Sequence, residues 1–247
     1  MTEQVEVAAA SASARVTPAA RAVPAAHVLD RAPWESLTGH HARFAQWHGR
    51  AVRYDPTVAT FVALEDESDP QAWEDVAELL GPDGRLVLPG VAEWPDSWKS
   101  VFQTEGVQMI ARRVDAQPDP EAVILGADDV PEILDLIART EPGPFLPRTV
   151  ELGRYLGIRR EGALVAMAGE RLHPPGWTEI SAVCTDPAYR GQGLASRLMR
   201  AVAAGIAERG ETPFLHALAT NTNAIRLYES LGFELRTTTT LTALVRA

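Results

Sequence analysis

Two glycines separated by a single residue, Gly191 and Gly193, constrain this chain more than any other feature of its sequence. They stand between an apolar run over 180–185 and a stretch with apolar residues at helical spacing over 192–209. Because glycine has no Cβ, the backbone at these positions can approach a ligand closely. The first turn of a helix also leaves N–H groups unpaired at the positive end of its dipole, which suits a phosphate. The stretch therefore predicts a strand, a phosphate-binding loop and a helix, in that order.

The composition is typical of a globular protein and argues against a nucleic-acid partner. Of the 247 residues, 46% are hydrophobic and 23% are charged, the ordinary balance of a folded domain. A formal net charge of -10 disfavours a phosphate backbone as a partner, because that interaction needs a basic surface. Cys184 is the single cysteine, so no intrachain disulfide forms and a reducing cytoplasm is the expected setting. No apolar run reaches the roughly 18 residues of a membrane-spanning helix, so no membrane span is expected.

Shifts in composition divide the chain into three parts. Residues 1–26 are rich in Ala, Ser, Thr, Val and Pro without a regular period, and we expect a disordered arm there. Residues 115–120 are polar and contain two prolines, which is typical of a linker. This linker separates an N-terminal α/β half, residues 27–115, from a second domain, residues 121–247.

The N-terminal half shows alternating helix and strand signals. Trp34, Leu37 and Trp47 recur at helical spacing. His40 and His41 lie in the same stretch without a partner at metal-ligand spacing, so structural or solvent-facing roles are expected for both. The expected elements are a helix over 34–47, strands over 50–54 and 60–64, a helix over 69–80, a strand over 84–88, a helix over 95–104 and a strand over 106–113.

The second domain is expected to be a sheet with helices around it. The order helix, strand, helix, strand over 70–113 repeats the order over 192–245, so the N-terminal half resembles a degenerate copy that lacks the glycine loop. The expected elements are strands over 122–125, 154–158, 163–170, 178–185, 214–218 and 233–245, and helices over 128–138, 192–209 and 221–231.

Two sequence blocks resemble the GNAT N-acyltransferase superfamily. The first is Arg190-Gly-Gln-Gly-Leu-Ala195, in which Arg190, Gly193 and Ala195 occupy the defining places of the family's cofactor motif. The second, over 221–233, resembles the helix and the Gly-Phe turn that follow downstream. The resemblance covers residues 121–247 and implies a mixed, mostly antiparallel sheet flanked by helices. Residues 142–145 and 167–171 are similar to the branch related to glycine N-acyltransferases.

The resemblance implies acetyl-CoA as the cofactor. Backbone N–H groups at the start of the helix would take the pyrophosphate, and the pantetheine arm would lie between strands 178–185 and 214–218, which splay apart in the family. Asn221 is also expected to cap its helix. The implied cofactor-binding residues are Val183, Cys184, Arg190, Gly191, Gln192, Gly193, Leu194, Ala195, Ser196, Asn221 and Tyr228.

The implied reaction is attack of an amine on a thioester, which needs a base, an oxyanion donor and an acid. Tyr228 matches the family's thiolate-protonating tyrosine, and a backbone N–H at Val183 or Cys184 would stabilise the oxyanion. Glu179 is the favoured base and Glu170 the competitor; either could instead hold the substrate ammonium or pair with Arg171.

Three other reactive side chains are not expected to take part in the chemistry. A covalent role for Cys184 is disfavoured, because no histidine is paired with it in the sequence and the family transfers the acyl group directly. His173 and His216 are interpreted as turn and strand residues.

The expected function is transfer of an acetyl group to a primary amine of a small molecule, an amino acid or a peptide N-terminus. The alternative is a non-catalytic acyl-CoA-binding sensor or regulatory module. A P-loop nucleotide enzyme is excluded, because no Gly-Lys-Ser/Thr closes the glycine loop. The oligomeric state stays open, with a homodimer as one option.

Overall fold

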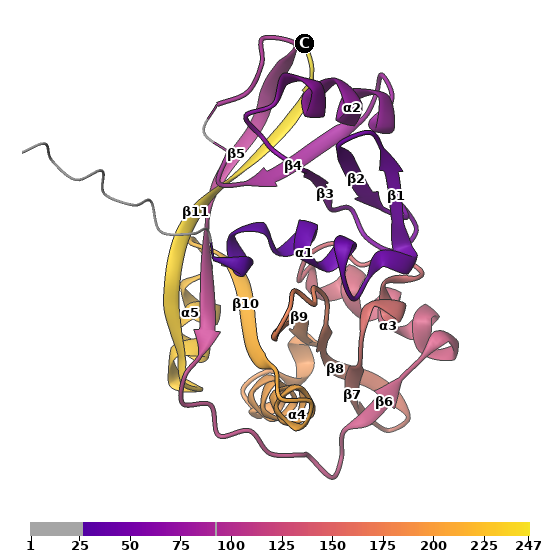
Figure 1. The fold of residues 1–247 in the computed structure, drawn as a ribbon. Coiled ribbons are helices and arrows are strands. Elements are labelled where there is room, and N and C mark those ends of the chain that lie inside the picture. The colour runs from indigo at the N-terminus through magenta and orange to yellow at the C-terminus, as the bar shows by residue number, and fades with distance from the viewer. Residues whose placement is uncertain (1–26, 92) are drawn as a thin grey trace, which may run out of the picture.

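An eight-stranded sheet forms the centre of the protein (Figure 1). The computed structural model describes residues 27–91 and 93–247; the arm predicted over 1–26 lies outside them. The strand order is β4-β11-β5-β10-β9-β8-β7-β6, and β9 and β10 are the one parallel pair in this sheet as described. The predicted mixed, mostly antiparallel sheet flanked by helices is confirmed.

The bounds of the strands and α-helices are as follows. The strands are β1 (Ala45–His48), β2 (Ala51–Tyr54), β3 (Val62–Leu64), β4 (Arg85–Pro89), β5 (Trp98–Ala111), β6 (Val123–Leu125), β7 (Tyr155–Arg160), β8 (Ala163–Glu170), β9 (Trp177–Thr185), β10 (Thr212–Leu218) and β11 (Phe233–Arg246). The α-helices are α1 (Ala32–Thr38), α2 (Pro70–Leu80), α3 (Val130–Thr140), α4 (Leu194–Glu208) and α5 (Thr222–Ser230).

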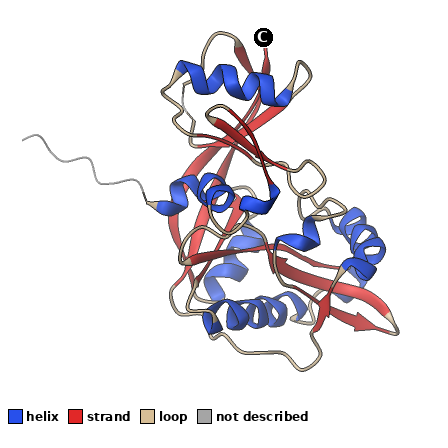
Figure 2. Cartoon of the chain, turned by 45° about the vertical axis from the view of Figure 1, so that its right-hand side comes forward, coloured by secondary structure: helices blue, strands red, loops and turns tan. Residues whose placement is uncertain are grey.

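Helices cover both faces of the sheet (Figure 2). Neighbouring residues of a strand point to opposite faces, and Leu215 packs in the cluster of α4 whereas Phe214 packs with Leu37 of α1. Helix α3 shares its cluster with Met167 and Cys184. The cross-strand registers place these residues on the same face as Phe214. Helices α4 and α5 thus cover one face, and α1 and α3 cover the other.

A strand of the N-terminal half completes this sheet. β5 lies between β10 and β11, pairing Met109 with both Leu215 and Leu235. β4 joins the outer edge of β11. The division at 115–121 and the independence of the two domains stay predictions, but the two parts share one set of strand hydrogen bonds.

The N-terminal half also holds a small sheet, β1-β2-β3, against which α2 packs. The capping Asp and the proline that predicted the start of α2 have the expected roles. The Asp69 side chain accepts a hydrogen bond from the N–H of Gln71, and Pro70 occupies the first turn. The helix stops at Gly81, whose φ of 73° favours glycine.

Two predicted helices are wrong. Residues 98–111 form a single strand, because pairing with β11 and β10 on its two sides outweighs the local helix signal over 95–104. The internal repeat inferred from that helix therefore fails at this element. The helix predicted over 34–47 ends at Thr38, and Trp47 lies on β1 with its ring 5.6 Å from that of Trp34.

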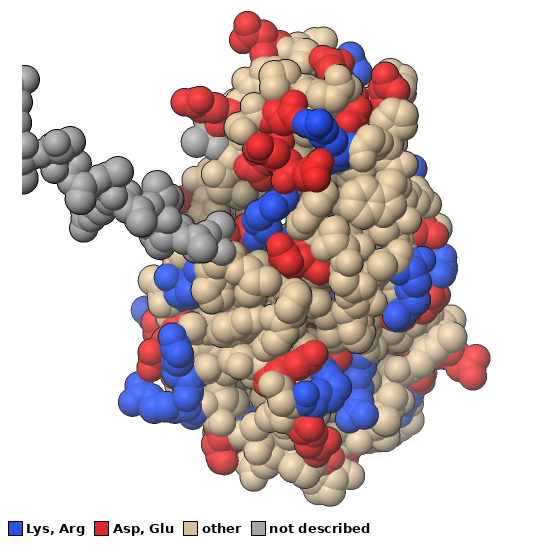
Figure 3. All heavy atoms as spheres, viewed as in Figure 1, with Lys and Arg blue, Asp and Glu red and all other residues tan. Residues whose placement is uncertain are grey.

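Acidic and basic side chains are interspersed on the face drawn in Figure 3. Many of them form ion pairs, such as the two-point pair of Arg197 with Asp119, which ties the segment before β6 to α4. Across the residues that the structure describes, no helix has the length and apolarity to span a membrane.

Candidate active site

Strands β9 and β10 diverge in the middle of the sheet. They pair in parallel from Trp177 and Thr212 as far as Glu179 and Phe214, and their pairing ends there. Ala182 bulges from β9 with a φ of 53°, a strained value for alanine. The register with β8 skips Ala182 and Val183. The predicted splay of the two strands is confirmed, and it opens a cleft, here called the splay cleft, between residues 180–185 and 216–218.

The glycine loop lies at one end of the splay cleft. Gly191 and Gly193 have φ values of 78° and 72°, and a Cβ at either position would meet no atom within 4 Å. Gly193 is the N-cap of α4 and supplies no side chain to its first N–H groups. The first amides of α4 therefore have no side-chain cap at the positive end of the helix, a setting that suits a phosphate.

Most of the predicted cofactor residues gather in the splay cleft. Asn221 caps α5, its Oδ1 accepting a hydrogen bond from the N–H of Ala224 at 3.2 Å. Gln192 is exposed in the glycine loop, outside the lining of the cleft. The predicted residues that line the cleft are Val183, Cys184, Arg190, Gly191, Gly193, Leu194, Ala195, Ser196, Asn221 and Tyr228.

Tyr228 reaches the splay cleft from α5, on the α4 side of the sheet. Its side chain is 9% exposed, and burial raises the pKa of its hydroxyl. Among the described residues the hydroxyl has no hydrogen-bond partner, so it is free to donate to a ligand. Burial also raises the pKa of the Cys184 thiol to about 11, so this thiol stays protonated near neutral pH and is a poor nucleophile.

Glu179 is fully buried and ion-paired. Arg171 donates Nε and Nη2 to its two oxygens at 2.7 and 2.6 Å, and Nδ1 of His216 lies 2.7 Å from Oε1. Burial alone would raise the pKa of Glu179, but Arg171 and His216 outweigh it and hold the pKa at about 2. Such a carboxylate is permanently ionised and weakly basic. Of the roles foreseen for Glu179, the structure contains the ion pair with Arg171.

Glu170 lies on the opposite face of the sheet. It pairs in register with Ile180, the residue after Glu179, and successive residues of a strand alternate between faces. Its oxygens accept hydrogen bonds from Nη2 of Arg209 and from the N–H of Arg154. Glu170 lines neither the splay cleft nor the cavity beside it.

A second, larger cavity of about 1150 Å³ adjoins the splay cleft on the α1 side. Its walls carry exposed apolar side chains, including Phe102 and Val87, and its rim carries the acidic Glu65–Glu67 segment. Two charged or titratable residues, Arg171 and His216, line both this cavity and the splay cleft. The two spaces therefore meet at these side chains.

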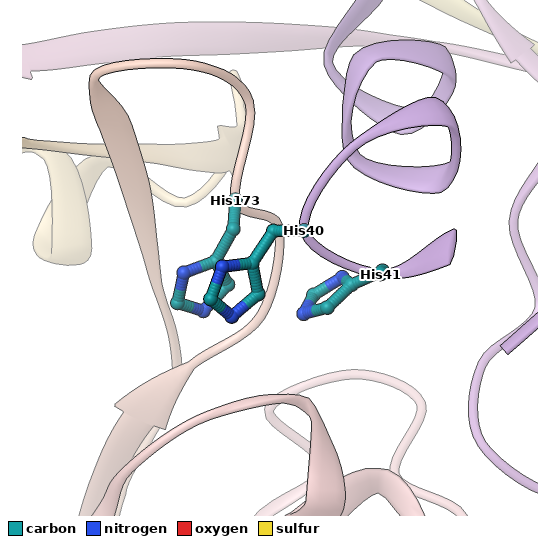
Figure 4. A group of neighbouring side chains, drawn as sticks. All are labelled: His40, His41 and His173. Atoms are coloured by element: carbon teal, nitrogen blue, oxygen red, sulfur yellow. The ribbon is translucent and has the colours of Figure 1, made fainter. Parts of the chain in front are cut away.

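Three histidines form a cluster that the sequence did not predict (Figure 4). None of them lines the splay cleft or the large cavity. The rings of His40 and His173 stack with centroids 4.5 Å apart. Both nitrogens of His41 are engaged, Nδ1 with the Tyr54 hydroxyl and Nε2 with the carbonyl of Leu152, each at 2.8 Å. Burial lowers the pKa of His41 to about 4 and that of His173 to about 3. The cluster offers two free ligand side chains at most, which is poor for a metal.

Comparison with known proteins agrees with this geometry. A family model described as FR47-like protein matches residues 155–242. A GNAT-family crystal structure from Novosphingobium aromaticivorans is 43% identical, covers 90% of this chain and all of its own, and superposes with a TM-score of 0.81. A GCN5-related N-acetyltransferase from Kribbella flavida, 18% identical over 87% of this chain and 95% of its own, shares the fold with a TM-score of 0.59. The fold is that of the GNAT acetyltransferases, and this chain belongs to the GNAT family.

Two curated mycobacterial proteins are also similar. An uncharacterized protein of Mycobacterium leprae is 31% identical over 204 residues, which is 75% of this chain and 55% of the relative. The N-alpha-acetyltransferase RimI of Mycobacterium tuberculosis is 39% identical over 83 residues, 32% of this chain and 51% of the relative. The chain thus spans about half the length of the curated relatives it matches. The narrower resemblance to glycine N-acyltransferases stays a prediction.

Proposed function

We propose that this protein transfers an acetyl group from acetyl-CoA to a primary amine of a small molecule, an amino acid or a peptide N-terminus. One observation carries the proposal: the diverging strands, the uncapped start of α4 and the free hydroxyl of Tyr228 border a single cleft. A donor with a pyrophosphate at one end and a thioester at the other needs these features in one place.

The residues fit the donor in charge and in space. The N–H groups after Gly193 and the guanidinium of Arg190 would hold the pyrophosphate. The arm would run between β9 and β10, where backbone groups freed from pairing can bond its amides. Val183 lies outside the register with β8, so its N–H is the favoured oxyanion donor. Tyr228 would supply the proton that the leaving thiolate takes up.

The acceptor would enter from the α1 side, through the large cavity. Carboxylates and arginines both line this cavity, and the carboxylates at 65–67 would hold a cationic amine. The apolar walls suit a hydrophobic body. An α-amine at a peptide N-terminus is one such acceptor, and the name of the mycobacterial relative RimI, an N-alpha-acetyltransferase, favours it. A cytoplasmic setting is part of the proposal, and the oligomeric state stays open with a homodimer as one option.

A thiol-release assay tests the function. The protein is mixed with acetyl-CoA and, in separate reactions, with amino acids, polyamines and short peptides with free N-termini. Release of coenzyme A that depends on one amine, with the acetylated amine found by mass spectrometry, supports the enzyme. Tight binding of acetyl-CoA without turnover of any amine would instead favour the acyl-CoA-binding sensor.

A further inference from the structure

We infer that His216 is the general base of this site and that Glu179 positions it. The inference rests on the proposed function and deepens it, since it names the group that takes the proton from the acceptor amine. It also changes the role foreseen for Glu179, whose carboxylate contacts His216.

His216 lies where the splay cleft and the large cavity meet. It stands on β10 two residues after Phe214, where pairing with β9 ends, and its side chain is 26% exposed. Arg171 is the other charged or titratable residue that lines both the splay cleft and the large cavity. An arginine stays protonated at any working pH. His216 is therefore the described group at this junction that can accept a proton.

The hydrogen bonds of His216 fix its tautomer. An ionised Glu179 can only accept, so Nδ1 of His216 carries the hydrogen that meets it at 2.7 Å. Nε2 faces the amide nitrogen of Gln108 at 2.9 Å. That amide is oriented by two further contacts: Nε2 of Gln108 donates to the carbonyl of Leu29, and its Oε1 accepts from Arg236. Gln108 thus donates to His216, and Nε2 of His216 bears the lone pair.

The carboxylate also fixes the ring. Nδ1 of His216 donates to a wholly buried anion, and this contact holds the tautomer whose Nε2 can take a proton. The other charges nearby are Arg171, which offsets part of the Glu179 charge, and Arg236, which pairs with Asp30. Among the described charged groups, Glu179 is the one that forms a hydrogen bond with the ring.

The base and the acid approach from opposite faces of the sheet. His216 points to the face of Phe214, whereas Tyr228 belongs to the cluster of Leu215 on the other face. Both line the splay cleft, since the gap between β9 and β10 opens through the sheet. An amine can thus arrive from the α1 side while the thiol leaves on the α4 side.

In the proposed acetyl transfer, the acceptor enters as a neutral amine. An N–H of the amine replaces Gln108 as the donor to Nε2 of His216. The amine nitrogen bonds to the acetyl carbonyl carbon, the carbon–sulfur bond breaks, and Nε2 takes the proton that the nitrogen loses. Tyr228 gives a proton to the sulfur. His216 then returns its proton, and Tyr228 regains one, through solvent.

Three measurements test the inference, and the first needs no variant. Nitrogen NMR of the wild-type ring should show hydrogen on Nδ1 and a lone pair on Nε2 at pH 8; the reverse tautomer would overturn the proposal. Second, His216→Gln should bind acetyl-CoA as the wild type does and lose about 10²- to 10⁴-fold in kcat/KM for the best amine of the panel.

Third, the acid limb of the pH profile of kcat/KM should vanish in His216→Gln. A limb that persists at the same pH would assign the ring a structural role, and the proposal would fail whatever the size of the rate loss. His48→Gln, at an exposed site on β1, is the matched control and should keep both rate and limb. An active wild type with an equally active His216→Gln overturns this inference alone. A wild type that turns over no amine overturns the proposed function and this inference with it.

Discussion

Arg171, which lines the splay cleft, forms a two-point ion pair with Glu179, with Nε–Oε2 and Nη2–Oε1 distances of 2.7 and 2.6 Å. The carboxylate is wholly buried and the arginine is 21% exposed. The attraction between the two groups offsets the free-energy cost of desolvating both charges only while both partners are present. The pair also fixes the Glu179 carboxylate that contacts His216. One carboxylate therefore contributes to the stability of the fold and to the proposed positioning of the base.

Arg171→Met should lower the free energy of unfolding by about 3–5 kcal/mol at pH 7, because it leaves a buried carboxylate without its main partner. The loss should shrink toward pH 5, since burial without Arg171 raises the pKa of Glu179 and lets it protonate. Denaturant titrations at the two pH values measure both effects. The same substitution at Arg160, whose pair with Glu121 is half-exposed, should cost about 1 kcal/mol or less. Equal losses for the two variants would contradict the prediction.

Gly193→Glu should abolish acetyl-CoA binding, because it places a carboxylate where the pyrophosphate is proposed to lie. Calorimetric titration with acetyl-CoA measures the loss. Gly210→Glu is a matched control: Gly210 also has a positive φ, 75°, and open space around its Cβ position, but it follows α4 at the far end. Both variants carry the same backbone strain, so normal binding by Gly193→Glu would refute the phosphate site.

Tyr228→Phe should lower kcat by about 10²-fold while changing the affinity for acetyl-CoA little, because it removes one proton donor and keeps the ring. Steady-state kinetics with the best amine of the panel separate the two quantities. Tyr189→Phe removes a hydroxyl from the same cleft and should leave kcat near the wild-type value. Parallel losses in kcat and affinity for Tyr228→Phe would point to a packing role instead.

His173→Asn should flatten the dependence of stability on pH. The folded-state pKa of His173 lies at about 3, below the ordinary value of 6.5, mainly because the ring is buried. Between those values the unfolded chain binds a proton that the folded chain does not. Wild-type stability therefore falls by up to about 1.4 kcal/mol per pH unit from this group as pH drops below 6.5. Unfolding titrations from pH 8 to pH 5 measure the slope, and identical slopes for variant and wild type would contradict the assignment.

A fragment of residues 121–247 should not fold alone. It lacks β5, so the edges of β10 and β11 would be unpaired in the middle of the sheet. Circular dichroism and gel filtration should show loss of structure or aggregation. Mixing the fragment with a peptide of residues 97–112 should restore part of the strand signal. A monomeric, cooperatively folded fragment would establish the second domain as independent.

The residues proposed to bind the cofactor could be predicted, because their structural roles depend on neighbours in the sequence. The glycines before α4 and the cap at Asn221 act within one turn of their own helices. The base side is not local. His216 meets Glu179 across a parallel strand pair and Gln108 across an antiparallel one, and no period in the sequence links the three. The signal present was a single histidine in the otherwise apolar run over 213–218.

The strand β5 was mispredicted for the same reason. Its helix signal over 95–104 is local, whereas the pairing that makes it a strand comes from residues more than a hundred positions away. Likewise the histidine cluster joins His40 and His41 to a turn that follows β8. Sequence spacing cannot show contacts of this kind.

The position of β11 between β4 and β5 has a consequence for how the protein is made. β4 and β5 leave the ribosome early but have no hydrogen bonds to each other in the finished sheet. The backbone N–H and C=O groups of β4 and β5 that face β11 stay unpaired until β11 has been synthesised. Closure of the sheet is thus a late event with a high entropic cost of loop closure. Until then the unpaired edges of β4 and β5 are open to pairing with other strands.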